Sequence, residues 1–108
     1  MKNGLYKASF KTQLGQGTGV VVINDGSIKG GDSSMYYSGT FQENNNQFTA
    51  TLHVGKHSDV PGIFSAFGLD DFNLEIQGTS TDNSATIQGT AVEAPTVHLQ
   101  AQLTLIVE

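Results

Sequence analysis

The sequence predicts an all-β protein, a single antiparallel up-and-down barrel of about eight strands formed by residues 1–108. Three observations support this. Apolar and polar residues alternate with a period of two along most of the chain, which is typical of half-buried strands. Short turn signals separate the alternating segments and favour antiparallel neighbours. Glycine supplies 13 of the 108 residues, well above its usual share of about 7%. A β-sandwich is the alternative architecture.

The composition limits the partners that the protein can bind. Five lysines, no arginine and ten acidic residues give a net charge of −5, so the chain lacks the basic face that nucleic-acid binding needs. Direct nucleic-acid binding is therefore not expected. The chain has no cysteine and no apolar run long enough for a signal peptide or a membrane span. These features favour a cytoplasmic protein with no membrane contact.

The first two strands are expected over residues 4–13 and 18–24, separated by a glycine-containing turn. In the first, apolar residues such as Tyr6 alternate with lysines. The second contains the continuous apolar run 20–23, which predicts a strand covered on both faces. One face would lie in the barrel core, and a partner subunit could cover the other.

A short third strand, residues 27–31, is expected between two sharp turns. The second turn carries Gly30, Gly31 and Asp32, and we interpret it as structural, because glycine lets the backbone bend or approach a neighbour closely. A turn aspartate commonly accepts hydrogen bonds from backbone N–H groups about two residues on. Recognition of a partner by this exposed turn is the alternative role.

Further strands are expected over residues 35–43, 47–55, 71–78, 84–93 and 96–107, the last sealing the sheet against the first strand. Tyr37 and Gly39 lie on one face of the strand 35–43, where a glycine favours a bend or close packing. Along the expected strands, the alternation of apolar and polar residues predicts which side chains point into the barrel: Tyr6, Phe10, Phe48, Leu52, Leu74, Leu99 and Leu103. The alternation does not show whether these side chains fill the interior or leave a cavity.

The segment between residues 57 and 69 breaks the strand pattern. Its apolar residues fall at helical spacing and predict a short helix near residues 59–67. Such a short helix is unstable alone, so its apolar face should pack as a lid over one barrel mouth or form a dimer contact. That face comprises Val60, Ile63, Phe64 and Phe67.

No pattern of residues predicts catalysis, a metal site or a cofactor. His53, His57 and His98 are not spaced as a zinc cluster. His57, Ser58 and Asp59 have the residue types of a catalytic triad, but neighbours on an extended chain point apart. We therefore expect a protein that is not an enzyme; a hydrolase or isomerase is a remote alternative.

Five short motifs nevertheless resemble one known family. They are Lys2-Asn3-Gly4-Leu5-Tyr6, Gly17-Thr18-Gly19, Asp25-Gly26, Gly30-Gly31-Asp32 and Tyr37-Ser38-Gly39. In this order and spacing the chain resembles the GrlR family, small bacterial regulators linked to control of type III secretion genes. The match is best over residues 2–54 and looser afterwards.

The resemblance implies a lipocalin-like barrel that forms a homodimer and acts as a negative regulator by binding a transcription activator. In the family, an acidic run in one turn is implicated in that contact. The corresponding residues here are Gln42, Glu43, Asn44 and Asn45, with a single acid, so capture of a basic surface by this turn is not expected to persist unchanged. The alternative function is binding of a small apolar ligand inside the barrel.

Overall fold

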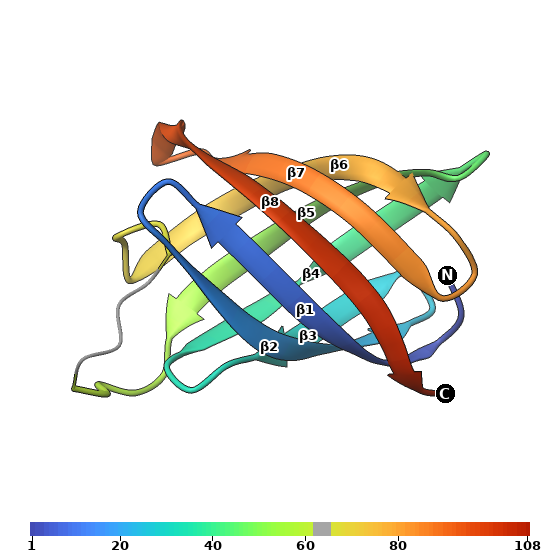
Figure 1. Cartoon of the computed structure of the whole chain (residues 1–108), viewed down its shortest axis with the longest axis horizontal. Coiled ribbons are helices and arrows are strands. Elements are labelled where there is room, and N and C mark those ends of the chain that lie inside the picture. The colour runs from blue at the N-terminus through green and yellow to red at the C-terminus, as the bar shows by residue number, and fades with distance from the viewer. Residues whose placement is uncertain (62–65) are drawn as a thin grey trace.

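The computed structural model describes residues 1–61 and 66–108. Eight antiparallel strands close into a barrel in which each strand pairs with the next and β8 pairs with β1 (Figure 1). The predicted eight-stranded barrel is thus confirmed, and the sandwich alternative is wrong. The strands are β1 (Gly4–Thr12), β2 (Gly15–Asn24), β3 (Ser27–Gly31), β4 (Met35–Asn44), β5 (Gln47–Lys56), β6 (Asp71–Ser80), β7 (Ser84–Ala91) and β8 (Ala94–Val107).

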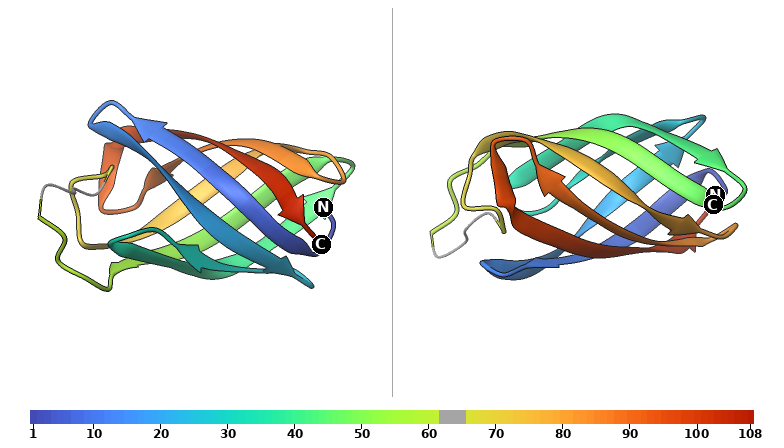
Figure 2. Two further views of the ribbon diagram at one scale, coloured as in Figure 1. Left: turned by 60° about the horizontal axis from the view of Figure 1, so that its bottom comes forward. Right: turned by 90° about the horizontal axis from the view of Figure 1, so that it is seen from above.

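The two ends of the barrel differ. Both termini lie at one end, together with the β2–β3, β4–β5 and β6–β7 turns, and the long β5–β6 connection lies at the other (Figures 1 and 2). We call these the floor and the mouth. At the floor, Tyr6, Ile23 and Phe48 are completely buried, with 0% of their surface exposed. Phe41 stacks on Phe48 with ring centroids 5.2 Å apart, so large side chains fill this half of the barrel.

The predicted helix near residues 59–67 is absent from the described residues, which form coil at 57–60 and turns at 61 and 66–67. The carbonyl oxygen of Ala66 accepts a hydrogen bond from the Thr12 hydroxyl, and so bonds to β1 rather than along a helix. Phe67 is buried and Val60 half-buried, whereas Ile63 and Phe64 lie outside the described residues.

Several strand boundaries differ from the expectation, and two turns account for most of the change. The first turn falls at Gln13 and Leu14, so that β2 already begins at Gly15. The last turn falls at Val92 and Glu93, and β8 includes Pro95. The β7–β8 register shifts there, which leaves Pro95 without a ladder partner. Proline has no N–H to donate, so a bulge tolerates it.

The apolar run at 20–23 is not covered on both faces within one chain. Val21 and Ile23 point into the core, while Val20 and Val22 are exposed. At the far end of β8, a register shift opposite Leu5 and Tyr6 leaves Ile106 and Val107 exposed as well. Strict alternation from Leu103 would instead place Val107 on the inner face. We call Val20, Val22, Ile106 and Val107 the outer apolar strip.

Candidate functional site: a cavity in the mouth half of the barrel

The mouth half of the barrel is hollow. It holds a cavity of about 300 Å³ whose walls are mainly apolar. Five of the seven predicted interior residues line it: Phe10, Leu52, Leu74, Leu99 and Leu103. The other two, Tyr6 and Phe48, are buried but lie outside its lining, because they fill the floor. The interior is therefore neither solidly packed nor open throughout.

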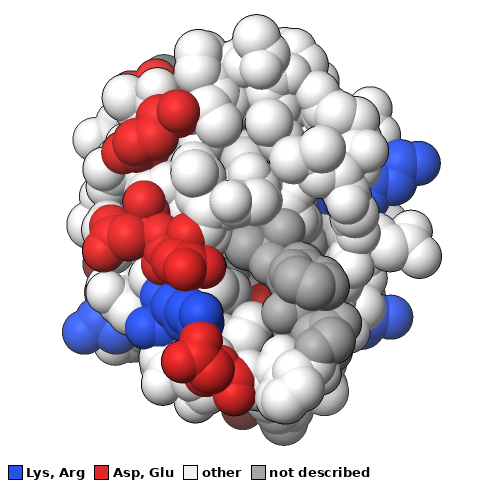
Figure 3. All heavy atoms as spheres, turned by 90° about the vertical axis from the view of Figure 1, so that its left-hand side faces the viewer, with Lys and Arg blue, Asp and Glu red and all other residues white. Residues whose placement is uncertain are grey.

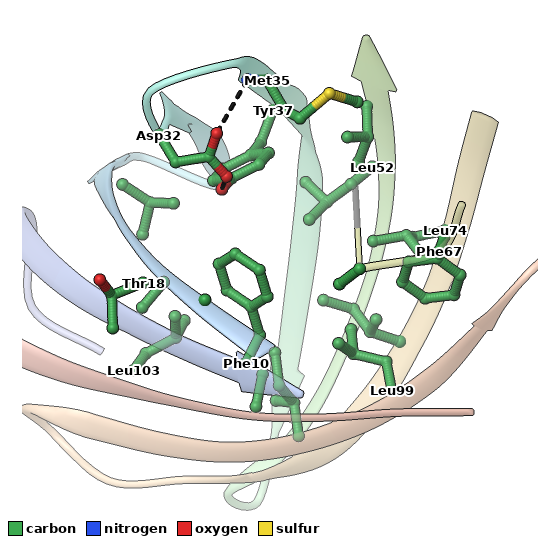
Figure 4. A pocket seen from close by; sticks show the side chains of 18 of the residues that line it. Phe10, Thr18, Asp32, Met35, Tyr37, Leu52, Phe67, Leu74, Leu99 and Leu103 are labelled. Atoms are coloured by element: carbon green, nitrogen blue, oxygen red, sulfur yellow. Dashed lines mark hydrogen bonds between the residues drawn. The ribbon is translucent and has the colours of Figure 1, made fainter. Parts of the chain in front are cut away.

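Inward and outward side chains alternate along each strand, and this alternation places these residues in the cavity wall. In β8, Leu99 and Leu103 are buried while Gln100 and Gln102 are exposed; in β5, Leu52 is buried between exposed Thr51 and half-buried His53. The aliphatic residues project from β5, β6 and β8 towards one space (Figure 4). Cavities of this volume with apolar walls fall at the lower end of the size range of protein ligand sites.

The β3–β4 turn supplies the polar rim of the cavity, and Asp32 organises it. Oδ1 of Asp32 accepts hydrogen bonds from the backbone N–H groups of Ser34 (3.0 Å) and Met35 (2.8 Å). Oδ2 accepts a hydrogen bond from the Tyr37 hydroxyl. The backbone N–H of Asp32 also donates to the Met35 carbonyl at 2.9 Å. These contacts hold the turn as the sequence interpretation expects, and they aim a carboxylate at the mouth (Figure 4).

Tyr37 joins this rim to the apolar wall. Its ring meets that of Phe10 edge to face, with centroids 6.3 Å apart and an interplanar angle of 87°. Burial and the hydrogen bond to the Asp32 carboxylate raise the pKa of the Tyr37 phenol above its usual value, because an ionised phenol would lose solvation and face a like charge. The neutral phenol therefore persists and keeps donating to Asp32.

Phe67 forms part of the cavity wall on the side of the β5–β6 connection. It is buried, lines the cavity and packs on Phe72 with ring centroids 4.9 Å apart. Together with the Thr12–Ala66 hydrogen bond, this packing places the residues after the undescribed segment against the mouth. The lid over the mouth and the dimer contact both stay predictions for the face that includes Phe67.

Glycines in the β3–β4 region allow a close approach of backbones. A Cβ added at Gly30 would lie 2.0 Å from the Val20 carbonyl oxygen, and one at Gly39 would lie 2.0 Å from that of Thr51. At Gly31 the Met35 carbonyl oxygen would be 2.6 Å away. Real Cβ atoms do not approach oxygen this closely, so the backbone geometry requires glycine at Gly30, Gly31 and Gly39.

The turn proposed from the resemblance to contact a partner is exposed, but its single acid is engaged within the barrel. Residues 42–45 are all exposed, and Asn45 adopts a left-handed conformation with φ 54°. Oε1 of Glu43 pairs with the N-terminal ammonium at 2.6 Å, and Oε2 accepts a hydrogen bond from the Ser80 hydroxyl. These hydrogen bonds outweigh the effect of burial and lower the pKa of the Glu43 carboxyl. The remaining side chains of this turn are amides.

His57 and Ser58 contact each other, contrary to the expectation that neighbouring side chains point apart. Nδ1 of His57 lies 2.8 Å from Oγ of Ser58, and Nε2 lies 2.9 Å from the Asp32 carbonyl oxygen. Because a carbonyl oxygen only accepts, Nε2 is the donor of this hydrogen bond. Asp59 instead pairs with Lys56, so the three residues form no relay, and neither His57 nor Ser58 lines the cavity.

The other two histidines lie on the outer surface. Nδ1 of His53 is 3.0 Å from Oδ1 of Asn73, and Nε2 is 3.3 Å from Oδ1 of Asp71; His98 is exposed. Among the described residues, no three His, Asp or Glu side chains gather as metal ligands. No helix in this part of the chain is long and apolar enough to cross a membrane.

Charged side chains gather along one side of the mouth (Figure 3). Lys56 lies between Asp59 and Asp70, the latter at 3.7 Å. Glu93 accepts hydrogen bonds from the backbone N–H and side-chain amide of Asn73 at 2.9 and 2.8 Å, and these bonds lower the pKa of its carboxyl. The carboxylates of Asp59 and Glu93 are thus engaged by neighbouring residues at the rim.

The outer apolar strip crosses three neighbouring strands at the floor end. Val22 of β2 and Val107 of β8 both pair with Leu5 of the intervening β1, and the strip residues are between 44% and 56% exposed. Sequence reasoning identified the β2 half from its apolar run. It missed the β8 half, because only the bulge opposite Leu5 and Tyr6 exposes Ile106 and Val107.

Comparison with protein-family models and with curated proteins finds no match for this chain.

Proposed function

We propose that this protein is a non-enzymatic, cytoplasmic regulator that restrains a transcription activator by protein–protein contact and works as a homodimer. The resemblance of residues 2–54 to the GrlR family, and with it a link to bacterial type III secretion genes, supports the proposal. The structural observation that supports the homodimer is the outer apolar strip. An apolar patch that spans several strands of an otherwise polar surface is a common mark of a protein interface.

A second copy of the chain is the proposed occupant of the strip. Val20 and Val22 form the outer face of the run that suggested a partner subunit, and Val107 and Ile106 extend it across β1. The activator is then held elsewhere. The β4–β5 turn can offer the exposed amides of Gln42, Asn44 and Asn45, whereas Glu43 already binds the N-terminal ammonium and Ser80.

Sedimentation at micromolar concentration tests the dimer. The wild type should sediment as a dimer, and Val22→Lys should shift it to monomer, because a buried unpaired charge opposes association. Gln88→Lys is the matched control: it introduces the same side chain on the outer face of β7 and should leave the dimer intact. A monomeric wild type would overturn this part of the proposal.

Binding of a small apolar ligand is the second candidate function, favoured by the cavity of about 300 Å³ in the mouth half. Eight-stranded barrels are just wide enough either to be filled by side chains or to hold one small ligand. Here large rings pack across the floor, whereas the described rings of the mouth half line a cavity. The two functions are compatible, since the strip lies on the outer surface and the cavity inside.

A further inference from the structure

This inference concerns which ligand the cavity binds, and it rests on the second candidate function, binding of a small apolar ligand. We propose that it takes a neutral, elongated apolar molecule with a hydrogen-bond donor such as a hydroxyl at one end, and that it discriminates against fatty acids and other anions. The size of the cavity, the charge of its walls and the unused acceptor on Asp32 each contribute to this assignment.

The volume sets the size of the ligand. An apolar protein cavity of about 150 Å³ binds one benzene molecule. The cavity here measures about 300 Å³, which leaves room for about two such rings or a chain of roughly ten carbons. Longer acyl chains would require the floor to open, and there Tyr6 and Phe48 are completely buried.

The walls set the charge of the ligand. Among the described residues that line the cavity, Asp32 carries the only full charge, and no Lys or His is present to pair with an anion. A ligand carboxylate would lose solvation without a counterion and would face the Asp32 carboxylate at the rim. A basic residue inside a barrel can pair with a fatty-acid carboxylate, and the described lining here has no such residue.

Asp32 also sets the polar group of the ligand. A carboxylate has about four acceptor sites, and three here are taken by the N–H groups of Ser34 and Met35 and the hydroxyl of Tyr37. Oδ2 has one hydrogen bond, so one acceptor site remains there, at the rim of the apolar space (Figure 4). A ligand hydroxyl can donate to it while the chain lies against Leu52, Leu74 and Leu99.

Calorimetric titration with 1-decanol and decanoate tests this assignment, because the two probes share a chain length and differ in the polar end. At about pH 7 decanoate is an anion, whereas 1-decanol is neutral. 1-Decanol should bind with a micromolar Kd, at least about tenfold tighter than decanoate, as expected for an unpaired anion beside a like charge. In Asp32→Asn the amide oxygen can still accept from the turn, but an NH2 donor replaces the free acceptor and the negative charge is gone. 1-Decanol should therefore bind more weakly and decanoate no more weakly than to the wild type, so the ratio of their Kd values should narrow to about threefold or less.

A separate experiment tests whether 1-decanol binds inside the cavity. Leu99→Trp should fill the space and abolish 1-decanol binding, while Gln100→Trp, the adjacent outward-facing position, should not. If Leu99→Trp loses its β-sheet circular dichroism, methyl NMR of the wild type replaces it. The Leu52, Leu74 and Leu99 methyls should shift on titration, and those of exposed Leu14 should not.

The contrary outcomes are distinct. Decanoate binding as tightly as 1-decanol would overturn the assignment of ligand class and leave ligand binding standing. Shifts confined to surface methyls, or binding unchanged in a folded Leu99→Trp variant, would overturn the site. No binding of either probe at millimolar concentration would overturn the ligand-binding function itself, and this inference with it.

Discussion

The Tyr37 hydroxyl donates a hydrogen bond to Oδ2 of Asp32, while Oδ1 of the same carboxylate accepts from two backbone N–H groups of the β3–β4 turn. One side chain thus ties the turn to β4 and places a charge at the cavity mouth.

Replacing Asp32 separates its hydrogen-bonding role from its charge. Asp32→Ala leaves two backbone N–H groups and the Tyr37 hydroxyl without their acceptor, so it should lower the free energy of unfolding by about 1–3 kcal/mol. Asp32→Asn should be mild, because its amide oxygen can still accept from Ser34 and Met35. Urea denaturation measures both variants. Equal losses in the two would show that the charge, and not the acceptor, holds the turn.

A methyl group at Gly30 should destabilise the barrel. Its Cβ would lie 2.0 Å from the Val20 carbonyl oxygen, so β2 and β3 must separate, at a cost of more than about 1 kcal/mol. Gly15→Ala is the control, since a Cβ there meets no atom within 4 Å. Thermal unfolding of the two variants compares them. A Gly30→Ala protein that is fully stable but no longer binds its partner protein would show that Gly30-Gly31-Asp32 is a contact site.

Leu103→Ala should cost about 2–5 kcal/mol of unfolding free energy, the usual range for a buried truncation, because Leu103 is only 5% exposed. The loss should fall towards the lower end, since Leu103 borders a cavity that already exists. Gln102→Ala faces outwards and should change stability by less than about 0.5 kcal/mol. Denaturant titrations giving the reverse order would place β8 one residue out of phase.

Stability should decline in acid, partly through Glu43. Hydrogen bonds from the N-terminal ammonium and Ser80 outweigh burial and hold the pKa of its carboxyl below the usual 4.5. A lowered pKa in the folded state means that the contribution is complete above about pH 4.5 and is lost as the pH falls through the folded-state pKa. Urea midpoints measured from neutral pH to about pH 3 should fall less steeply for Glu43→Gln than for the wild type. Parallel profiles would mean that Glu43 titrates normally.

The sequence was sufficient for the barrel and for the direction of most side chains. A period of two decides which residues face inwards, and the seven predicted interior residues are all inside or half-buried in the barrel. It could not decide whether they fill the space, because that depends on how side chains from eight strands share one volume. Phe41 stacks on Phe48 at the floor, whereas the rings of Phe10 and Phe67 line the cavity in the mouth half.

Three features depend on contacts that no local pattern contains. The Glu43 carboxylate meets an N-terminus 42 positions away, so an apparently solvated turn acid is engaged. The bulge opposite Leu5 turns Val107 outwards. The helical spacing of Val60 and Phe67 predicted a helix, but the Ala66 carbonyl bonds to Thr12 instead, because tertiary contacts can override a short helix that is marginal alone.

The central claim, restraint of a transcription activator by protein contact, is tested most directly by a gel shift. Affinity purification from the source cell supplies the DNA-binding protein that accompanies this chain, and the complex of that activator with its promoter is titrated with the purified barrel protein. We predict that the activator–promoter band disappears as the barrel protein is added, while the barrel protein alone does not shift the promoter even at low salt. A promoter band shifted by the barrel protein alone, or an activator–promoter band that persists at saturating barrel protein, would contradict the claim.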